Sequence, residues 1–203
     1  MAVMLGFVCE FTAQPPDRSH MQTTLKQLTD FFQEVGADQV NHSDKTYLAH
    51  AIGVYNDLKK WGWDEDLART GIFHSIYGTE LFQDFKLPLD RRSDVRALIG
   101  ERAEWLAYLN CAMDRTHFDA EISKAAGPYT ILDRFEETEI TVFDADFHDL
   151  CFMHLCDWTE QVERWDNWDY RREAYQTLAK RLGGIALTTY DQVFANAPPA
   201  KRS

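Results

Sequence analysis

Two amphipathic segments joined by a very short link constrain the fold of this chain more than any other feature. The first, residues 43–61, carries apolar side chains at the spacing of an α-helix. Its inward stripe consists of Tyr47, His50, Ala51, Val54, Leu58 and Trp61. The second, residues 65–77, follows Asp64 as a helix cap and places Leu67 and His74 on one face. Since the link WGWDED leaves room only for a tight turn, the two segments are predicted to be antiparallel neighbouring helices.

Gly71 lies in the middle of the second segment, on the same face as His74. A glycine inside a helix costs about 1 kcal/mol of helix propensity relative to alanine. We therefore expect the backbone at Gly71 to approach the neighbouring helix closely.

The rest of the chain predicts a mainly helical fold. Further helical segments are expected at residues 21–36, 93–115, 146–165 and 169–183, with a last helix ending at Phe194. Two runs rich in β-branched and aromatic residues, 129–135 and 139–143, flank a polar turn and predict a β-hairpin. The expected fold class is therefore all-α in the main, with about seven helices and one small β-hairpin near residues 129–143.

A single domain is expected over residues 21–196, because no repeat, low-complexity segment or shift of composition marks a boundary. Residues 1–20 contain adjacent prolines and are expected to be an irregular leader. Residues 197–203 are expected to be a loose tail.

The negative net charge of the chain argues against two classes of binding partner. Lysine and arginine number 21 against 33 aspartates and glutamates, which gives a formal net charge of -12. Neither nucleic acid nor a membrane surface is expected as a partner, because both attract basic proteins. The sequence shows no membrane-spanning run, no signal peptide, and no metal-type or disulfide-type spacing among its four cysteines. These features predict a cytoplasmic protein that acts on a small molecule, and they indicate no particular oligomeric state.

His50 and His74 are predicted to face each other across the helix pair. Neutral imidazoles on adjacent apolar faces are good ligands for iron, manganese or zinc, although a hydrogen-bonded pair of core histidines is an equal alternative. Asp157 lies on an otherwise apolar helix face, with His154 one turn before it. A carboxylate there needs a cation or dense hydrogen bonding, and a salt bridge to an arginine would also satisfy it. Two histidines and one aspartate suit a divalent metal with open coordination positions.

The segment YLAHAIGVYNDLKKWGWDEDLARTGIFHSIYG, with LCDW much later in the chain, resembles the HD superfamily of metal-dependent enzymes. There, one helix carries a histidine in an H-x-x-x-V pattern, a second ends in A-x-x-H-D-I-G, and a later helix supplies an aspartate. More narrowly, H-S-x-Y-G-T is similar to an uncharacterised HD-related family over about residues 38–115, and the wider likeness extends to about residue 165. The resemblance implies an HD-like helical bundle with His50, His74 and Asp157 as metal ligands.

Ser75 stands where the superfamily has its namesake aspartate, which binds metal and in two-metal members commonly bridges both ions. A serine hydroxyl is a poor replacement at neutral pH, so a two-metal site of the usual kind is not expected. A one-metal site is expected instead, in which His42, His154 or Glu80 completes the ligand set. Complete loss of the metal is the alternative.

The turn after His74 offers further candidate catalytic groups. Ser75 and Thr79 could orient a substrate oxygen, Tyr77 could donate a hydrogen bond to a developing anion, and Glu80 could act as a general base. An equally good interpretation is a helix end fixed by local hydroxyl hydrogen bonds.

Arg102 and Glu104 are candidate substrate-binding residues in the helix that follows the turn. A surface ion pair is the alternative for this segment, because charged residues at helical spacing commonly form one.

Three functions follow from these features. The resemblance favours a metal-dependent hydrolase that acts on a phosphoester of a small molecule. Some HD-superfamily members use iron to activate oxygen, so a mononuclear or dinuclear non-haem iron oxygenase acting on a small organic substrate is a second candidate. Ser75 favours a third, a metal-free module that binds a small molecule or another protein.

Overall fold

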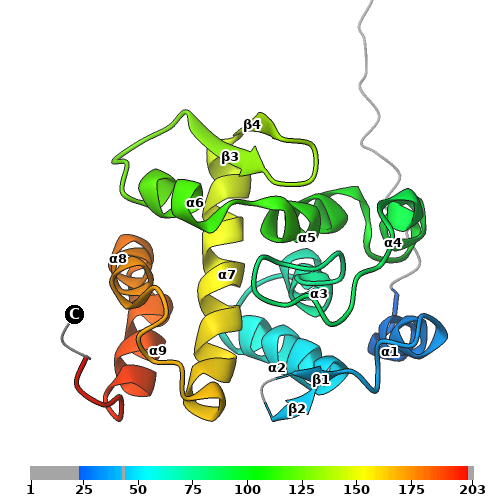
Figure 1. The fold of residues 1–203 in the computed structure, drawn as a ribbon, viewed down its shortest axis with the longest axis horizontal. Helices are drawn as coiled ribbons and strands as arrows, with labels where there is room; N and C mark the ends of the chain where they lie inside the picture. Colours follow the sequence, from blue (N-terminus) through cyan, green and yellow to red (C-terminus); the bar gives the residue numbers. More distant parts are fainter. Residues whose placement is uncertain (1–22, 43, 201–203) are drawn as a thin grey trace, which may run out of the picture.

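The computed structural model describes residues 23–42 and 44–200, which are mainly helical (Figure 1). The first half of the described chain contains α1 (Leu25–Glu34), β1 (Asn41–His42), β2 (Lys45–Thr46), α2 (Tyr47–Lys60), α3 (Glu65–Phe73), the 3-10 helix η1 (Leu89–Arg91) and α4 (Arg92–Ile99). The second half contains α5 (Glu101–Ala112), α6 (Arg115–Ile122), β3 (Tyr129–Asp133), β4 (Thr138–Val142), α7 (Asp144–Trp165), α8 (Arg172–Leu182) and α9 (Gly184–Phe194). The prediction of a mainly helical fold with a small hairpin is confirmed.

The two ends of the chain add little to this description. The predicted leader, residues 1–20, lies outside the described residues. Residues 197–200 have no regular secondary structure, and residues 201–203 again lie outside the described part.

The long helix α7 organises the fold. It runs through the middle of the molecule, with α8 and α9 on one side and α2, α3 and α5 on the other (Figure 1). Its buried residues include the polar side chains of His154, Asp157 and Gln161. Buried polar groups need partners, so the surroundings of these three side chains define the interior site.

The helices α2 and α3 form the predicted antiparallel pair. Their ends are capped by the side chains of Thr46 and Asp64, which accept hydrogen bonds from backbone N–H groups in the first turns. A β-carbon added to Gly71 would lie 2.7 Å from Leu58 Cδ1 and 3.1 Å from Val54 Cγ1. The predicted close approach at Gly71 is therefore observed, and it brings His50 and His74 together across the interface.

Replacing Gly71 with alanine is expected to lower the free energy of unfolding by about 1–3 kcal/mol, since the added methyl overpacks the α2–α3 interface. Urea denaturation would measure the change. The double variant Gly71→Ala with Leu58→Ala should lose less stability than the sum of the single changes, because it removes the nearer overlapping carbon. Additive losses would show that the two residues are not coupled.

The single helix predicted at residues 93–115 is wrong. Gly100, with φ 94° and ψ 158°, adopts a conformation open to glycine alone and separates α4 from α5. A second break follows at Met113, whose backbone is extended. Asp114 then caps α6 by accepting a hydrogen bond from the backbone of His117 at 2.7 Å. This break places Arg115 at the start of α6.

Two short antiparallel hairpins complete the fold. The hairpin β3–β4 pairs Tyr129 with Val142 and lies above α5 and α6 (Figure 1), where the sequence places it. The hairpin β1–β2 pairs Asn41 with Thr46. Its strands of two residues are too short to show a period in the sequence, so it was not expected.

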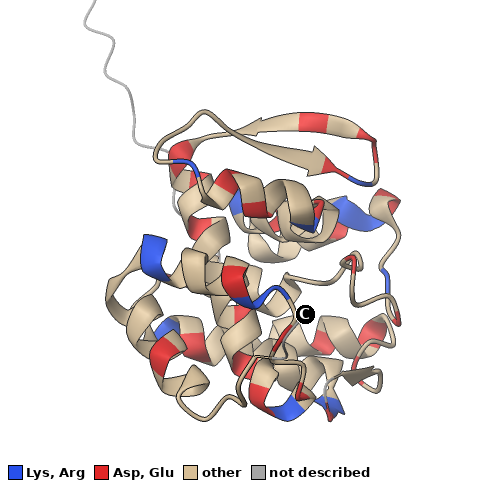
Figure 2. Cartoon of the chain, turned by 60° about the vertical axis from the view of Figure 1, so that its left-hand side comes forward, with Lys and Arg blue, Asp and Glu red and all other residues tan. Residues whose placement is uncertain are grey.

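Charged side chains are spread over the fold. Acidic positions occur on most helices and basic positions are fewer (Figure 2). Within the part of the chain that the structure describes, no helix is both long enough and apolar enough to cross a bilayer.

Candidate metal centre

Three potential metal ligands from three separate elements meet in the interior. His50 comes from α2, His74 from the end of α3 and Asp157 from α7, and all three are buried. His50 Nε2 lies 3.0 Å from Asp157 Oδ1, and His74 Nε2 lies 3.3 Å from the same oxygen. The two Nε2 atoms are 3.3 Å apart. This is the His/Cys/Asp/Glu group in the described chain whose donor atoms converge closely enough to hold an ion.

The remaining nitrogen of each histidine is held by an acceptor. His74 Nδ1 lies 2.7 Å from the carbonyl oxygen of Gly71, and His50 Nδ1 lies 2.6 Å from Glu160 Oε2. Since a carbonyl can only accept, His74 carries a proton on Nδ1, and its Nε2 is the nitrogen that faces Asp157. Metal-binding histidines are oriented in this way in proteins generally.

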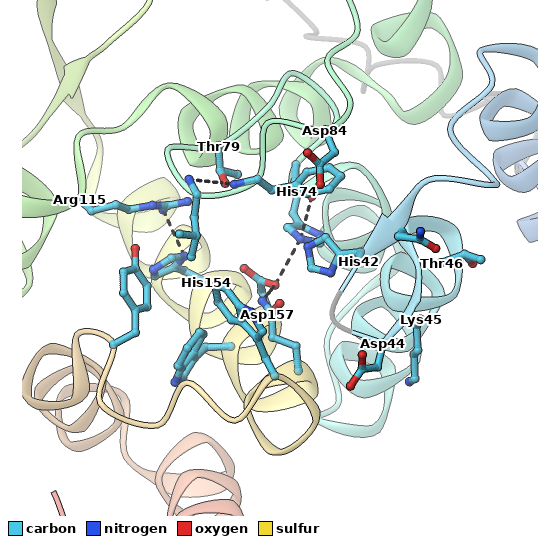
Figure 3. A pocket seen from close by; sticks show the side chains of 18 of the residues that line it. His42, Asp44, Lys45, Thr46, His74, Thr79, Asp84, Arg115, His154 and Asp157 are labelled. Carbon is cyan, nitrogen blue, oxygen red and sulfur yellow. Dashed lines mark hydrogen bonds and ion pairs between the residues drawn. The ribbon is translucent and has the colours of Figure 1, made fainter. Parts of the chain in front are cut away.

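The donor set fits a divalent cation. Three atoms that can each donate an electron pair to a metal, His50 Nε2, His74 Nε2 and Asp157 Oδ1, lie within 3.3 Å of one another. In Figure 3 the side chains of His74 and Asp157 point toward each other at the wall of the cavity. Two imidazoles and one carboxylate are also a ligand set that leaves coordination positions open for water and substrate.

The protonation behaviour of the cluster reflects the same close contacts. Burial acts to raise the pKa of Asp157, but the charge of His74 and the hydrogen bonds with His50 and His74 outweigh it and hold that pKa well below its usual range. Burial acts to lower the pKa of His50, but its contacts with Asp157 and Glu160 raise it overall. Asp157 is therefore a carboxylate at neutral pH, the form that binds metal.

Glu160 is a further residue of the candidate site that the sequence analysis did not identify. Its carboxylate contacts His50 and is itself fixed by Lys45 at 2.9 Å and Arg164 at 2.6 Å. Gly53 makes room for it, because a β-carbon there would lie 2.4 Å from Glu160 Oε1. The signal was present in the sequence, since Glu160 follows Asp157 at a spacing of three on the same helix.

The turn after His74 divides into groups that reach the site and groups that do not. Ser75 Oγ lies 3.0 Å from His74 Nε2 and lines the cavity together with His74 and Asp157. Thr79 also lines the cavity, but its hydroxyl accepts hydrogen bonds from the backbone N–H groups of Leu81 and Phe82. This contact is the local fixation of the helix end that the sequence offered as an alternative.

Tyr77 and Glu104 are brought together, but not at the cavity. Tyr77 donates a hydrogen bond to Glu104 at 2.9 Å, and Glu104 is fully buried between Arg92 and Arg96. Burial, followed by the charge of Glu104, raises the pKa of Tyr77 far above its usual value. This cluster joins the turn to α4 and α5, and its place in the fold is structural.

Glu80 and Arg102 also lie away from the cavity wall. Glu80 is exposed, and its carboxylate is 3.4 Å from the backbone nitrogen of Arg115. Arg102 forms ion pairs with Asp146 at 2.9 Å and Asp149 at 2.7 Å. The surface ion pair was the alternative for Arg102, and the structure shows it.

His42 lies beside the three candidate ligands but is not part of their group. Its ring stacks on His50 with centroids 4.4 Å apart and an angle of 5° between the rings. Burial and the charge of His50 lower the pKa of His42 to about 3. His42 therefore stays neutral and covers one face of His50 at the cavity wall.

His154 is held by cations and is unsuited to bind a metal. Its Nε2 accepts from Arg171 at 3.0 Å, and its Nδ1 lies 3.1 Å from the side-chain oxygen of Asn110 and 3.3 Å from Arg115. Burial, reinforced by the charges of Arg115 and Arg171, lowers the pKa of His154 well below its usual value. Its Nε2 already has Arg171 and Tyr175 as partners, which argues against His154 as a metal ligand.

His154→Gln is expected to flatten the pH dependence of stability in metal-free protein. The unfolded state binds a proton at His154 below about pH 6.5 and the folded state does not, so wild-type stability falls as the pH drops below that value. The variant should lose less stability than wild type as the pH falls below about 6.5. Urea denaturation at several pH values gives the free energy of unfolding of both proteins. The same dependence on pH in wild type and variant would contradict the conclusion that His154 stays neutral in the folded protein.

His50 is buried beside His74 and Asp157, which line a cavity of about 720 Å³. Its polar wall includes His74, Ser75, Arg115, His154 and Asp157. Its aromatic wall consists of Phe82, Trp158, Trp165, Tyr170 and Tyr175. A space of this size, with a few polar groups on an aromatic lining, is typical of a small-molecule site.

Residues 31–115 match the model of a family described as a domain of unknown function (DUF6817). The matched segment contains His42, His50 and His74, and it ends before Asp157. No curated protein and no solved structure matches the chain. The function must therefore be argued from the geometry of the cavity.

Proposed function

We propose that this chain is a metal-dependent hydrolase that acts on a phosphoester of a small molecule. The observation that supports it most strongly is the convergence of His50 Nε2, His74 Nε2 and Asp157 Oδ1 at one point. His74 and Asp157 line the cavity there, and the outer nitrogen of each histidine is held by an acceptor. The HD-like pattern of these residues in the sequence supports the same proposal.

A bound divalent metal would supply a Lewis acid and a water of lowered pKa. His50, His74 and Asp157 would hold it, and Gln161 fixes the carboxylate by donating to Asp157 Oδ1 at 2.8 Å. Ser75 places a hydroxyl next to His74, where it can hydrogen bond a substrate oxygen. The aromatic wall excludes water from the rest of the substrate.

Iron-dependent oxidation of a small organic substrate is the second candidate. The specific observation in its favour is the two-histidine, one-carboxylate set with open positions, which also holds mononuclear iron in oxygenases. The aromatic lining of the cavity suits an apolar substrate equally well.

Metal analysis and two activity assays separate these candidates. Purified protein reloaded with Mn²⁺, Zn²⁺ or Fe²⁺ would be assayed against a panel of phosphomonoesters and phosphodiesters, and for oxygen consumption with Fe²⁺. Phosphate release that chelation abolishes and metal restores supports the hydrolase. Oxygen consumption without hydrolysis supports the oxygenase. Protein that binds none of these metals would contradict both and favour a metal-free binding module.

A further inference from the structure

Arg115 is a buried cation at the cavity wall without a carboxylate partner. The residue is 6 % exposed. Among the described residues, no carboxylate oxygen lies within 4.0 Å of its guanidinium, whereas most other arginines of the fold are paired. Burying an unpaired charge is costly, so proteins keep one where it has a ligand to bind.

The neighbours of Arg115 use only part of its hydrogen-bonding capacity. Its Nη1 donates to Asn110 Oδ1 and contacts His154 Nδ1, each at 3.3 Å. Within the described residues, Nε and Nη2 donate to no acceptor. Figure 3 shows the guanidinium of Arg115 reaching from α6 toward His154, on the side of the cavity opposite His42.

The charges around Arg115 do not neutralise it. The second guanidinium nearby belongs to Arg171, which is paired with Asp119 through Nε at 2.9 Å. Burial, followed by the charge of Arg171, lowers the pKa of Arg115, although an arginine remains charged at neutral pH. The acidic residues Asp44 and Asp84 also line the cavity, but both are exposed and lie toward the opposite side (Figure 3).

A metal at the three-ligand site would increase the positive charge of the cavity further. Asp157 is the carboxylate in the interior that partly offsets Arg115, and metal binding would engage it. An anionic ligand would then satisfy both the open hydrogen-bond donors and the charge. Guanidinium groups bind phosphate and carboxylate oxygens through two parallel N–H donors, which Nε and Nη2 offer here.

We propose that Arg115 forms an anion subsite of the cavity, in which its Nε–H and Nη2–H groups bind a phosphate or carboxylate group of the ligand. The inference rests on the proposed function only in taking this cavity as the substrate site. It does not require the metal, since the guanidinium belongs to the chain itself.

Anion binding to chelated protein tests this subsite separately from the metal. Inorganic phosphate and acetate would be titrated into metal-free wild type, with thermal unfolding and calorimetry as readouts. At least one anion is expected to bind and raise Tm, and the tighter one identifies the chemistry of the group. Arg115→Gln should weaken that binding at least tenfold, Arg115→Lys should weaken it less, and the surface variant Arg91→Gln should leave it unchanged.

A measurement on wild-type protein tests the proposal even if the Arg115 variants fail to fold. The side-chain Nε–H resonance of Arg115 should shift during the titration with the same Kd as calorimetry gives. If neither anion binds, or if the anion binds equally to Arg115→Gln, or if another arginine shifts instead, the proposed subsite is wrong. A metal-free protein that still binds the anion would leave this inference standing even if hydrolysis were disproved.

Discussion

Asp157→Asn protein is expected to bind Mn²⁺, Fe²⁺ or Zn²⁺ at least about 100-fold more weakly than wild type, because loss of a direct ligand should exceed the effect of removing a supporting residue. Asp157 supplies the anionic ligand of the three, and asparagine keeps its size while removing the charge. Calorimetric titration of chelated protein measures the affinity.

His74→Ala is expected to lose metal to a similar extent, since His74 Nε2 converges on the same point. His117→Ala is the matched control. His117 lies on α6 with its ring nitrogen 3.0 Å from Thr130, away from the cavity. The metal affinity of His117→Ala protein should therefore equal that of wild type. Full metal occupancy in His74→Ala protein would disprove the ligand assignment.

Glu160→Gln is expected to lower metal affinity by about 10- to 100-fold without removing a ligand, because Glu160 orients His50 and increases its basicity. Gly53→Ala should produce a similar loss, since its methyl would occupy the position of Glu160 Oε1. The displaced group is the end of a flexible side chain, so the fold should be retained.

The exposed residue Glu163 provides the control for this prediction. It lies on α7 three residues beyond Glu160, and Glu163→Gln should bind metal as wild type does. If Glu160→Gln and Glu163→Gln had the same metal affinity, Glu160 would have no role beyond its ion pairs with Lys45 and Arg164.

The helices and the ligand group could be predicted because local patterns encode them. The periodicity of α2 and α3, the short link between them and Gly71 together place His50 opposite His74. Asp157 stood out as a carboxylate on an apolar face. These features depend on residues close in sequence, or on one polar group in an apolar setting.

The surroundings of the site could not be predicted in the same way. Arg115 reaches His154 only because the chain breaks at Gly100 and again before α6, and the sequence suggested one continuous helix there. Tyr77 and Glu104 were expected at the site, but they form a hydrogen bond with each other away from the cavity. Such pairings depend on how distant helices pack, which helical spacing alone does not determine.

The central claim is that three side chains from α2, α3 and α7 bind one divalent metal ion. Titration of chelated wild-type protein with Mn²⁺, followed by calorimetry and thermal unfolding, tests it most directly. One ion per chain should bind, and metal at 100 times Kd should stabilise the fold by about 2.7 kcal/mol. Absence of binding, together with a Tm that neither metal nor chelator changes, would contradict the claim.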